Sequence, residues 1–152
     1  MWPTSAIPTP TPFPTVTPGP VPTLALPNLE GEELSLEEWR GTNVILNFWA
    51  TWCYPCRTEM PTLAAVHAEN EDVIVVGVNY EESAADARAF VEELDLDFPI
   101  LLDQEGKLAD KFRVVGLPTT FFINRDGQII GSHIGPVTEE MLDGIISQLR
   151  AS

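Results

Sequence analysis

Apolar positions along the chain follow two alternating patterns, which predict strands and helices in turn. Apolar runs typical of buried strands cover residues 43–49, 73–79, 98–102 and 116–123, and a further strand is expected over 128–134. Apolar residues at helical spacing mark residues 57–70, 83–94 and 107–112, followed by a last helix that begins at Thr138. The succession predicts an α/β domain.

The connections predict how these strands pair. A helix joins the first two runs, so their strands should lie parallel, with a right-handed crossover. An Asp-Gly turn at 124–127 predicts that residues 128–134 return as an antiparallel hairpin partner. Residues 24–26 and 33–36 predict a short opening hairpin. We therefore expect a mixed sheet with helices on both faces.

Residues 1–22 differ from the rest of the chain, because they carry no charge and hold most of its prolines, alternating with threonine. Proline fixes φ and removes backbone donors, so this segment should be an extended stalk with no packed core. The folded domain is expected over residues 23–152. We interpret the stalk as the spacer behind an N-terminal membrane anchor or lipoprotein signal that precedes this sequence. The alternative is a flexible tail of no consequence.

Charge and length limit the partners of the chain. No segment is long and apolar enough to span a membrane. The net charge of −15, with eight scattered Lys and Arg residues, argues against binding to nucleic acid or to anionic lipid surfaces. An acidic surface on a small domain favours a monomer.

The two cysteines of the chain, Cys53 and Cys56, stand where a strand pattern becomes a helix pattern. At this spacing they can close a small disulfide ring, and a helix N-terminus stabilises a thiolate on the first. Cys53 is therefore the candidate nucleophile and Cys56 its resolving partner. A zinc site would need two more ligands, which only His67 and His133 offer, and a structural disulfide this short would add little stability. The pair favours redox chemistry that requires no metal or organic cofactor.

Several features accompany this motif. They are the run 47–53, a proline five residues after Cys56, a Gly-x-Pro-Thr sequence at 116–119, the opening hairpin, and an additional helix and strand over 83–102. Together they resemble the thioredoxin fold, and most closely the membrane-tethered extracytoplasmic thiol-disulfide oxidoreductases of the TlpA/ResA/CcmG type. The resemblance covers roughly residues 24–150. It implies a mixed central sheet with helices on both faces, an N-terminal β-hairpin and an inserted helix–strand unit.

The resemblance assigns roles to further residues. Pro118 is similar to the cis-proline beside the active-site disulfide, and the backbone at Leu117 would pair with an extended substrate strand. Glu59 matches an acidic residue near the cysteines, where burial would raise its pKa and let it exchange a proton with the dithiol. The buried Asp of cytosolic thioredoxins falls at Asn47, which leaves Glu59 as the titrating group. The alternatives are an ordinary trans proline and an exposed helix carboxylate.

The residues around the cysteines extend the expected substrate surface. Trp52, Tyr54 and Pro55 would contact the client protein together with Leu117. The dipeptide between the cysteines lacks the histidine of strongly oxidising motifs, and Pro55 suits a reductant.

The resemblance thus implies an enzyme that reduces disulfides of extracytoplasmic client proteins, such as apocytochrome c, with electrons from a transmembrane thiol reductase. An oxidase or isomerase that uses the same cysteines is one alternative. A copper(I) metallochaperone that binds through both thiolates is another. A peroxiredoxin is less favoured, because the position of its threonine is Ala50.

Overall fold

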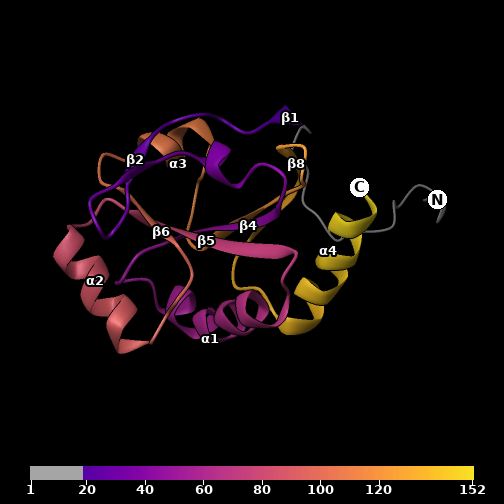
Figure 1. Ribbon diagram of the computed structural model, residues 1–152. Coiled ribbons are helices and arrows are strands. Elements are labelled where there is room, and N and C mark those ends of the chain that lie inside the picture. Colours follow the sequence, from indigo (N-terminus) through magenta and orange to yellow (C-terminus); the bar gives the residue numbers. More distant parts are fainter. Residues whose placement is uncertain (1–18) are drawn as a thin grey trace, which may run out of the picture.

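The computed structural model describes residues 19–152, which form a central six-stranded sheet with helices on both faces (Figure 1). The strands, in spatial order, are β1 (Gly19–Pro20), β8 (Gln128–Ile134), β7 (Thr119–Ile123), β4 (Asn43–Trp49), β5 (Val73–Tyr80) and β6 (Ile100–Asp103). A separate hairpin pairs β2 (Leu26–Pro27) with β3 (Glu33–Leu34), and the one-turn 3-10 helix η2 (Leu36–Trp39) follows it. The α-helices of the described residues are α1 (Tyr54–Glu69), α2 (Ala84–Glu93), α3 (Lys107–Lys111) and α4 (Glu139–Ala151).

Strand β4 lies inside the sheet, and every one of its residues is buried. It pairs in parallel with β5, in a register that runs from Asn43 opposite Val73 to Trp49 opposite Asn79. On its other side it pairs antiparallel with β7, which continues into the β8 hairpin. The parallel pair and the C-terminal hairpin confirm the mixed sheet predicted from the sequence.

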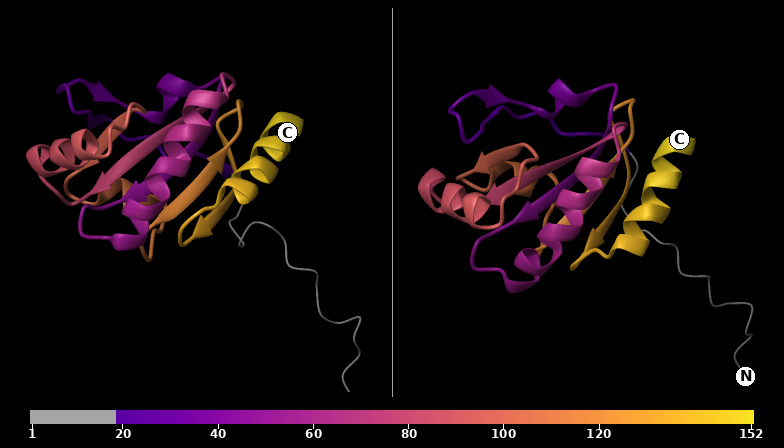
Figure 2. Two further views of the ribbon diagram at one scale, coloured as in Figure 1. Left: turned by 90° about the horizontal axis from the view of Figure 1, so that it is seen from below. Right: turned by 60° about the horizontal axis from the view of Figure 1, so that its bottom comes forward.

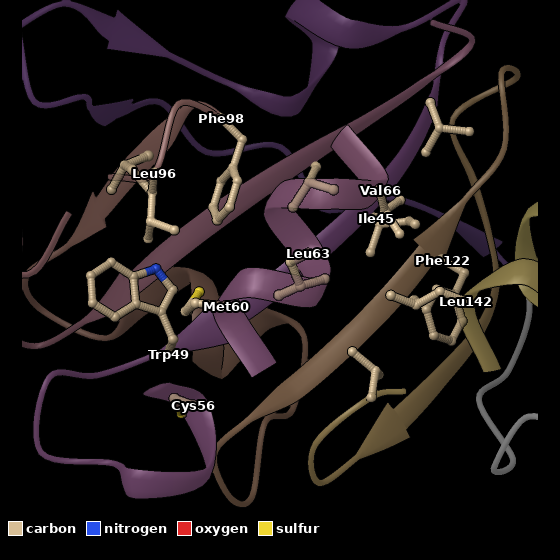
Figure 3. Packing of buried hydrophobic residues seen from close by; sticks show 14 of the residues in the cluster. Ile45, Trp49, Cys56, Met60, Leu63, Val66, Leu96, Phe98, Phe122 and Leu142 are labelled. Carbon is tan, nitrogen blue, oxygen red and sulfur yellow. The ribbon is translucent and has the colours of Figure 1, made fainter. Parts of the chain in front are cut away.

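Each face of the sheet carries its own apolar core, because successive residues of a strand point to opposite faces. Ile45 and Trp49 pack under α1, α2 and α4, whereas Leu46 and Phe48 pack under α3 and the opening hairpin. Figure 1 shows α3 and β2 on one side of the sheet and α1 on the other, and Figure 2 shows α1 and α4 across the same face. The close-up in Figure 3 shows the core beneath α1.

The topology brings three chain segments to one end of the sheet. Parallel strands β4 and β5 both end there, and antiparallel β7 begins there, since Phe48 lies opposite Thr119. The loops that follow Trp49 and Tyr80, and the loop that precedes Thr119, therefore meet at this end. We call it the redox end, because the loop after Trp49 leads to Cys53.

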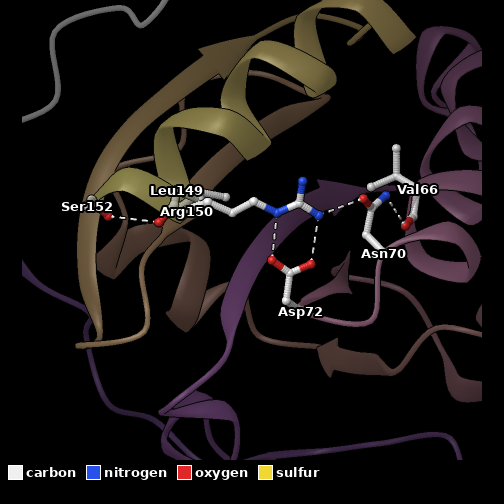
Figure 4. A network of polar contacts seen from close by, with 6 residues as sticks. All are labelled: Val66, Asn70, Asp72, Leu149, Arg150 and Ser152. Carbon is white, nitrogen blue, oxygen red and sulfur yellow. Dashed lines mark hydrogen bonds and ion pairs between the residues drawn. The ribbon is translucent and has the colours of Figure 1, made fainter.

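Polar contacts fasten α4 at the opposite end of the sheet (Figure 4). The Arg150 guanidinium donates to both carboxylate oxygens of Asp72, just before β5, at 2.7 and 2.8 Å. It also donates to the side-chain oxygen of Asn70 at 3.1 Å. This two-point geometry orients the C-terminal helix, although solvent weakens an exposed ion pair.

Two strands begin later than the sequence predicts. β6 begins at Ile100 rather than Phe98, and β7 begins at Thr119 rather than Gly116. A proline precedes each starting residue, and proline has no N–H to donate to a neighbouring strand. The apolar runs are correctly located, but the ladder of hydrogen bonds starts only after the proline.

The predicted stalk, residues 1–22, lies mostly outside the described residues. Its last part belongs to the fold, because Gly19 and Pro20 pair with β8 and the Val21 N–H donates to the Gly127 carbonyl at 3.1 Å. The folded part therefore begins before residue 23. None of the helices in residues 19–152 has the length and apolar character needed to cross a membrane.

The short helix α3 depends on a carboxylate outside it. Its N-cap is Gly106, which has no side chain, and the buried Asp103 accepts from the N–H groups of Leu108 and Ala109 at 3.0 and 2.8 Å. Asp103→Ala leaves two buried donors unsatisfied, so we expect a loss of about 2–4 kcal/mol in the free energy of unfolding.

Urea denaturation measures this loss. The exposed Asp97 offers a matched control, since Asp97→Ala should change stability by no more than about 0.5 kcal/mol. Equal effects of the two substitutions would contradict the capping role.

Candidate active site

The turn after β4 places the two cysteines at the start of α1. Cys53 is the N-cap of this helix, and its sulfur accepts from the Cys56 N–H at 3.3 Å. The Cys53 N–H donates to the Ala50 carbonyl at 3.2 Å, which closes the turn. The two sulfurs form a disulfide with the Cα atoms 5.3 Å apart. Free N–H groups and the helix dipole at this position favour a thiolate on Cys53 once the bond is reduced.

The two cysteines differ in their access to solvent. Cys53 exposes 5% of its surface and Cys56 exposes none. Figure 3 shows Cys56 near Trp49 and Met60, and all three belong to the apolar core beneath α1. A molecule that approaches from solvent therefore meets Cys53 first.

Pro118 lies at the same end of the sheet as the disulfide. The Leu117–Pro118 peptide bond is cis, as the resemblance implies, and Pro118 is buried. Its carbonyl accepts from the Gly135 N–H at 2.8 Å, and Thr119 then starts β7 opposite Phe48. The half-buried Leu117 precedes it at the surface.

Glu59 lies on the inner side of α1 and is 2% exposed. Its carboxylate accepts from the Asn47 side-chain amide at 3.1 Å and from the Val137 N–H at 3.3 Å. The same Asn47 amide nitrogen donates to the Thr120 hydroxyl at 3.0 Å. Burial raises the pKa of Glu59 from its ordinary 4.5 to about 7, outweighing the two hydrogen bonds, which lower it. The exposed-carboxylate alternative is therefore wrong, and the strand residue Asn47 holds this carboxylate in place.

Exposed apolar side chains surround the disulfide. Trp52 and Tyr54 are 68% and 75% exposed, and Pro55 is also exposed. Trp52 also lines a groove of about 310 Å³, together with Leu117 and with Gly106, the N-cap of α3. The four residues predicted to contact substrate thus lie on the surface at the redox end.

Two sets of polar contacts near the cysteines were not predicted from the sequence. The Glu82 carboxylate accepts from the Thr51 N–H and from the Asn79 side-chain amide, each at 2.8 Å, and from the Thr51 hydroxyl. Arg57 of α1 pairs with Glu93 of α2 and lies over the Phe90 ring. The only signal for Glu82 in the sequence is its place two residues after a parallel strand, at the carboxyl end where functional groups gather.

The other candidate ligands have structural roles or lie apart. The ring nitrogen Nδ1 of His67 accepts from the Val75 N–H at 3.1 Å, as expected of a packed helix histidine. Within residues 19–152, no cluster of three or more His, Cys, Asp or Glu side chains is arranged to hold a metal ion.

Comparison with known sequences finds relatives that are thioredoxin-like proteins or thiol-disulfide oxidoreductases. Residues 19–132 match the model of the AhpC/TSA family. The chain is 42% identical over 126 residues to the thioredoxin-like protein YneN of Bacillus subtilis, which covers 80% of this chain and 74% of that protein. It is 34% identical over 131 residues to the thiol-disulfide oxidoreductase ResA of the same species, with 85% and 73% covered.

Comparison with solved structures agrees. The crystal structure of StoA from Bacillus subtilis superposes with a TM-score of 0.71 at 30% identity, over 83% of this chain and 97% of that one. The disulfide at the start of α1, the cis-proline and the mixed sheet thus agree with similarity to these proteins over most of the chain. This chain belongs to the AhpC/TSA family, and it is a thiol-disulfide oxidoreductase with a thioredoxin fold.

Proposed function

We propose that the enzyme reduces disulfides of extracytoplasmic client proteins, such as apocytochrome c, through the dithiol of Cys53 and Cys56. The observation that carries this proposal is the disulfide at the start of α1, in which Cys53 exposes 5% of its surface to solvent and Cys56 exposes none. That asymmetry suits one cysteine for attack on a large client and the other for an internal second step.

The proposed reaction begins with the Cys53 thiolate, which attacks one sulfur of the client disulfide. A mixed disulfide forms, the client bond breaks, and the other client sulfur leaves as a thiolate that takes up a proton. Cys56 then loses its proton and attacks the Cys53 sulfur, which releases the second client sulfur as a thiolate that also takes up a proton. The client has gained two electrons and two protons, and the enzyme carries the Cys53–Cys56 disulfide. The exchange needs no metal or organic cofactor.

Glu59 is the proposed proton acceptor for the second step. Its pKa of about 7 lets it change protonation state at neutral pH, between the values of an ordinary carboxyl and a thiol. Its position one helical turn after Cys56 on α1 supports transfer to or from that cysteine, directly or through one water.

The client is proposed to bind across the exposed rim. Trp52, Tyr54 and Pro55 offer an apolar surface around Cys53, and the backbone at Leu117, before the cis Pro118, offers main-chain groups to an extended client strand. A narrow strand suits this site, because Cys53 is only slightly exposed.

The cellular setting is part of the same proposal. The proline- and threonine-rich segment before the domain, together with the resemblance to membrane-tethered reductases, supports a location outside the cytoplasm on an N-terminal anchor. An upstream membrane thiol reductase would return the two electrons to the disulfide. The domain would act as a monomer.

Substitution of each cysteine tests the order of attack. Cys53→Ser removes the attacking thiolate, so turnover of a disulfide-bearing client should fall to the uncatalysed rate. Cys56→Ser removes only the resolving thiol, so a mixed disulfide between Cys53 and the client should accumulate. Non-reducing electrophoresis with mass spectrometry identifies that adduct. Full turnover by either variant would contradict the assignment.

Glu59→Gln tests the proton acceptor. In the wild-type enzyme, resolution of a preformed mixed disulfide should accelerate as pH rises through about 7, because Glu59 becomes the charged acceptor there. Glu59→Gln should remove this inflection and leave only the titration of the thiol. Stopped-flow rates between pH 5 and pH 9 measure it, with the exposed Glu69→Gln as control. Identical profiles for Glu59→Gln and the wild type would rule out this role.

The same substitution has a predicted effect on stability. The folded protein keeps the Glu59 proton up to about pH 7, whereas the unfolded chain loses it near 4.5. The folded state therefore binds more protons between these values, and the free energy of unfolding should fall as pH rises through this window, by roughly 3 kcal/mol in total. Glu59→Gln should remove that slope in urea denaturation.

A further inference from the structure

Glu82 is the second residue after β5, at the redox end, and is half-buried there. Its oxygen Oε1 accepts from the Thr51 N–H and from the Asn79 side-chain amide, both at 2.8 Å, and Oε2 accepts from the Thr51 hydroxyl. Three donors thus converge on one carboxylate, which is the arrangement that orients a side chain firmly. The link joins the loop after β4 to the loop after β5.

The hydrogen-bond donors to Glu82 come from two parts of the chain, a buried strand and a turn. Asn79 is fully buried on β5 and lies opposite Trp49 in the parallel ladder, so its side chain is a fixed reference point. Thr51 belongs to the turn between Trp49 and Cys53, outside any strand or helix. Glu82 therefore transfers the rigidity of the sheet to this turn.

The turn leads straight to the nucleophile. Thr51 is two residues before Cys53, and the Cys53 N–H donates to the Ala50 carbonyl at 3.2 Å. A shift of Thr51 would move both ends of this hydrogen-bonded turn. The Cys53 sulfur would then lose its alignment with the Cys56 N–H, from which it accepts a hydrogen bond at 3.3 Å.

We propose that Glu82 is a positioning residue for the reaction, holding Thr51 so that the Cys53 sulfur faces the start of α1 and the incoming client. This inference rests on the proposed role of Cys53 as nucleophile. The negative charge of Glu82 is not what matters. The acceptor geometry is what fixes the turn.

The rest of the same inserted segment supports this role. Beyond Cys56, Arg57 pairs with Glu93 and lies over the Phe90 ring at 4.9 Å, and both partners belong to α2. The stretch from Glu82 to Glu93 thus contacts the chain on both sides of the two cysteines. Glu82, just before α2, contacts the turn before Cys53, and α2 itself contacts Arg57 after Cys56.

Two substitutions separate geometry from charge. Glu82→Gln keeps an oxygen for the Thr51 N–H and the Asn79 amide, and its new amide can donate to the Thr51 hydroxyl. Glu82→Ala removes every one of these contacts. Glu92→Ala, on the exposed side of α2, makes the same change of charge away from the turn and serves as control.

The experiment measures alkylation of reduced Cys53 by iodoacetamide against pH, and the second-order rate with a disulfide-bearing peptide. For Glu82→Ala, we expect the second-order rate to fall by about tenfold or more, because misplaced reacting groups lose rate steeply. The apparent thiol pKa should rise, because the thiolate loses alignment with the helix N-terminus. Glu82→Gln and Glu92→Ala should stay within about threefold of the wild type. The charged groups Arg57, Glu59 and Glu93 remain the same in Glu82→Ala and Glu82→Gln.

Other outcomes would overturn the inference. If both Glu82 variants lower the thiol pKa alike, the charge is the active feature, since removing a nearby negative charge favours the thiolate. If neither variant changes rate or pKa, Glu82 plays no part. Circular dichroism establishes that Glu82→Ala is folded. Should it not fold, Glu82→Asp replaces it, because the shorter side chain withdraws the carboxylate from the Thr51 N–H while keeping the charge, and a rate and pKa equal to the wild type would then overturn the inference.

The cysteine variants keep this test apart from the proposed function. If Cys53→Ser is inactive and Glu82→Ala behaves as the wild type, only the positioning role fails. If Cys53→Ser retains turnover, the proposed nucleophile itself is wrong. A double variant adds a direct check, because Thr51→Ala should have no further effect once Glu82→Ala has released the turn.

Discussion

Burial of β4 on both faces is the constraint that places the redox chemistry. The strand lies between β5 and β7, and its last residue, Trp49, is fully buried and stacked on the Phe90 ring with centroids 4.5 Å apart. Cys53 follows only four residues later, so its position is determined by the central strand rather than by a free loop. The same pairing sets β7 beside β4 and brings the cis Leu117–Pro118 bond to the same end. The positions of the proposed nucleophile and of the proposed client surface thus both follow from one packed strand.

A buried carboxylate on α1 is the second consequence of this packing. Glu59 receives hydrogen bonds from Asn47 on the strand and from Val137 ahead of α4, so three elements meet around it. Burial outweighs these bonds and raises its pKa to about 7. The strand contributes an amide that cannot titrate, and the helix contributes the group that can. A group that can titrate close to neutral pH thus lies on the helix that contains Cys56 and begins at Cys53.

Local signals in the sequence predict most of the fold. Apolar periodicity and the Asp-Gly turn give the order of strands and helices, and the position of Cys53 at a helix start follows from them. The contact of Glu82 with Thr51 has no such signal, because the residues are 31 positions apart and one donor is a backbone N–H. The pairing of Gly19 and Pro20 with β8 is also hidden, because they end a proline-rich segment. Proline is tolerated there because β1 is an edge strand that needs few donors.

The reduction potential of the Cys53–Cys56 pair separates a reductase of client disulfides from an oxidase. Equilibration in graded dithiol buffers, read by thiol trapping, gives this value for the folded enzyme. A reductase of client disulfides requires a potential below about −230 mV, on the side of the scale where thioredoxin lies. We predict such a value. A potential near or above about −180 mV would make the resting disulfide the active form and the protein an oxidase or isomerase, which would contradict the proposed reductase function.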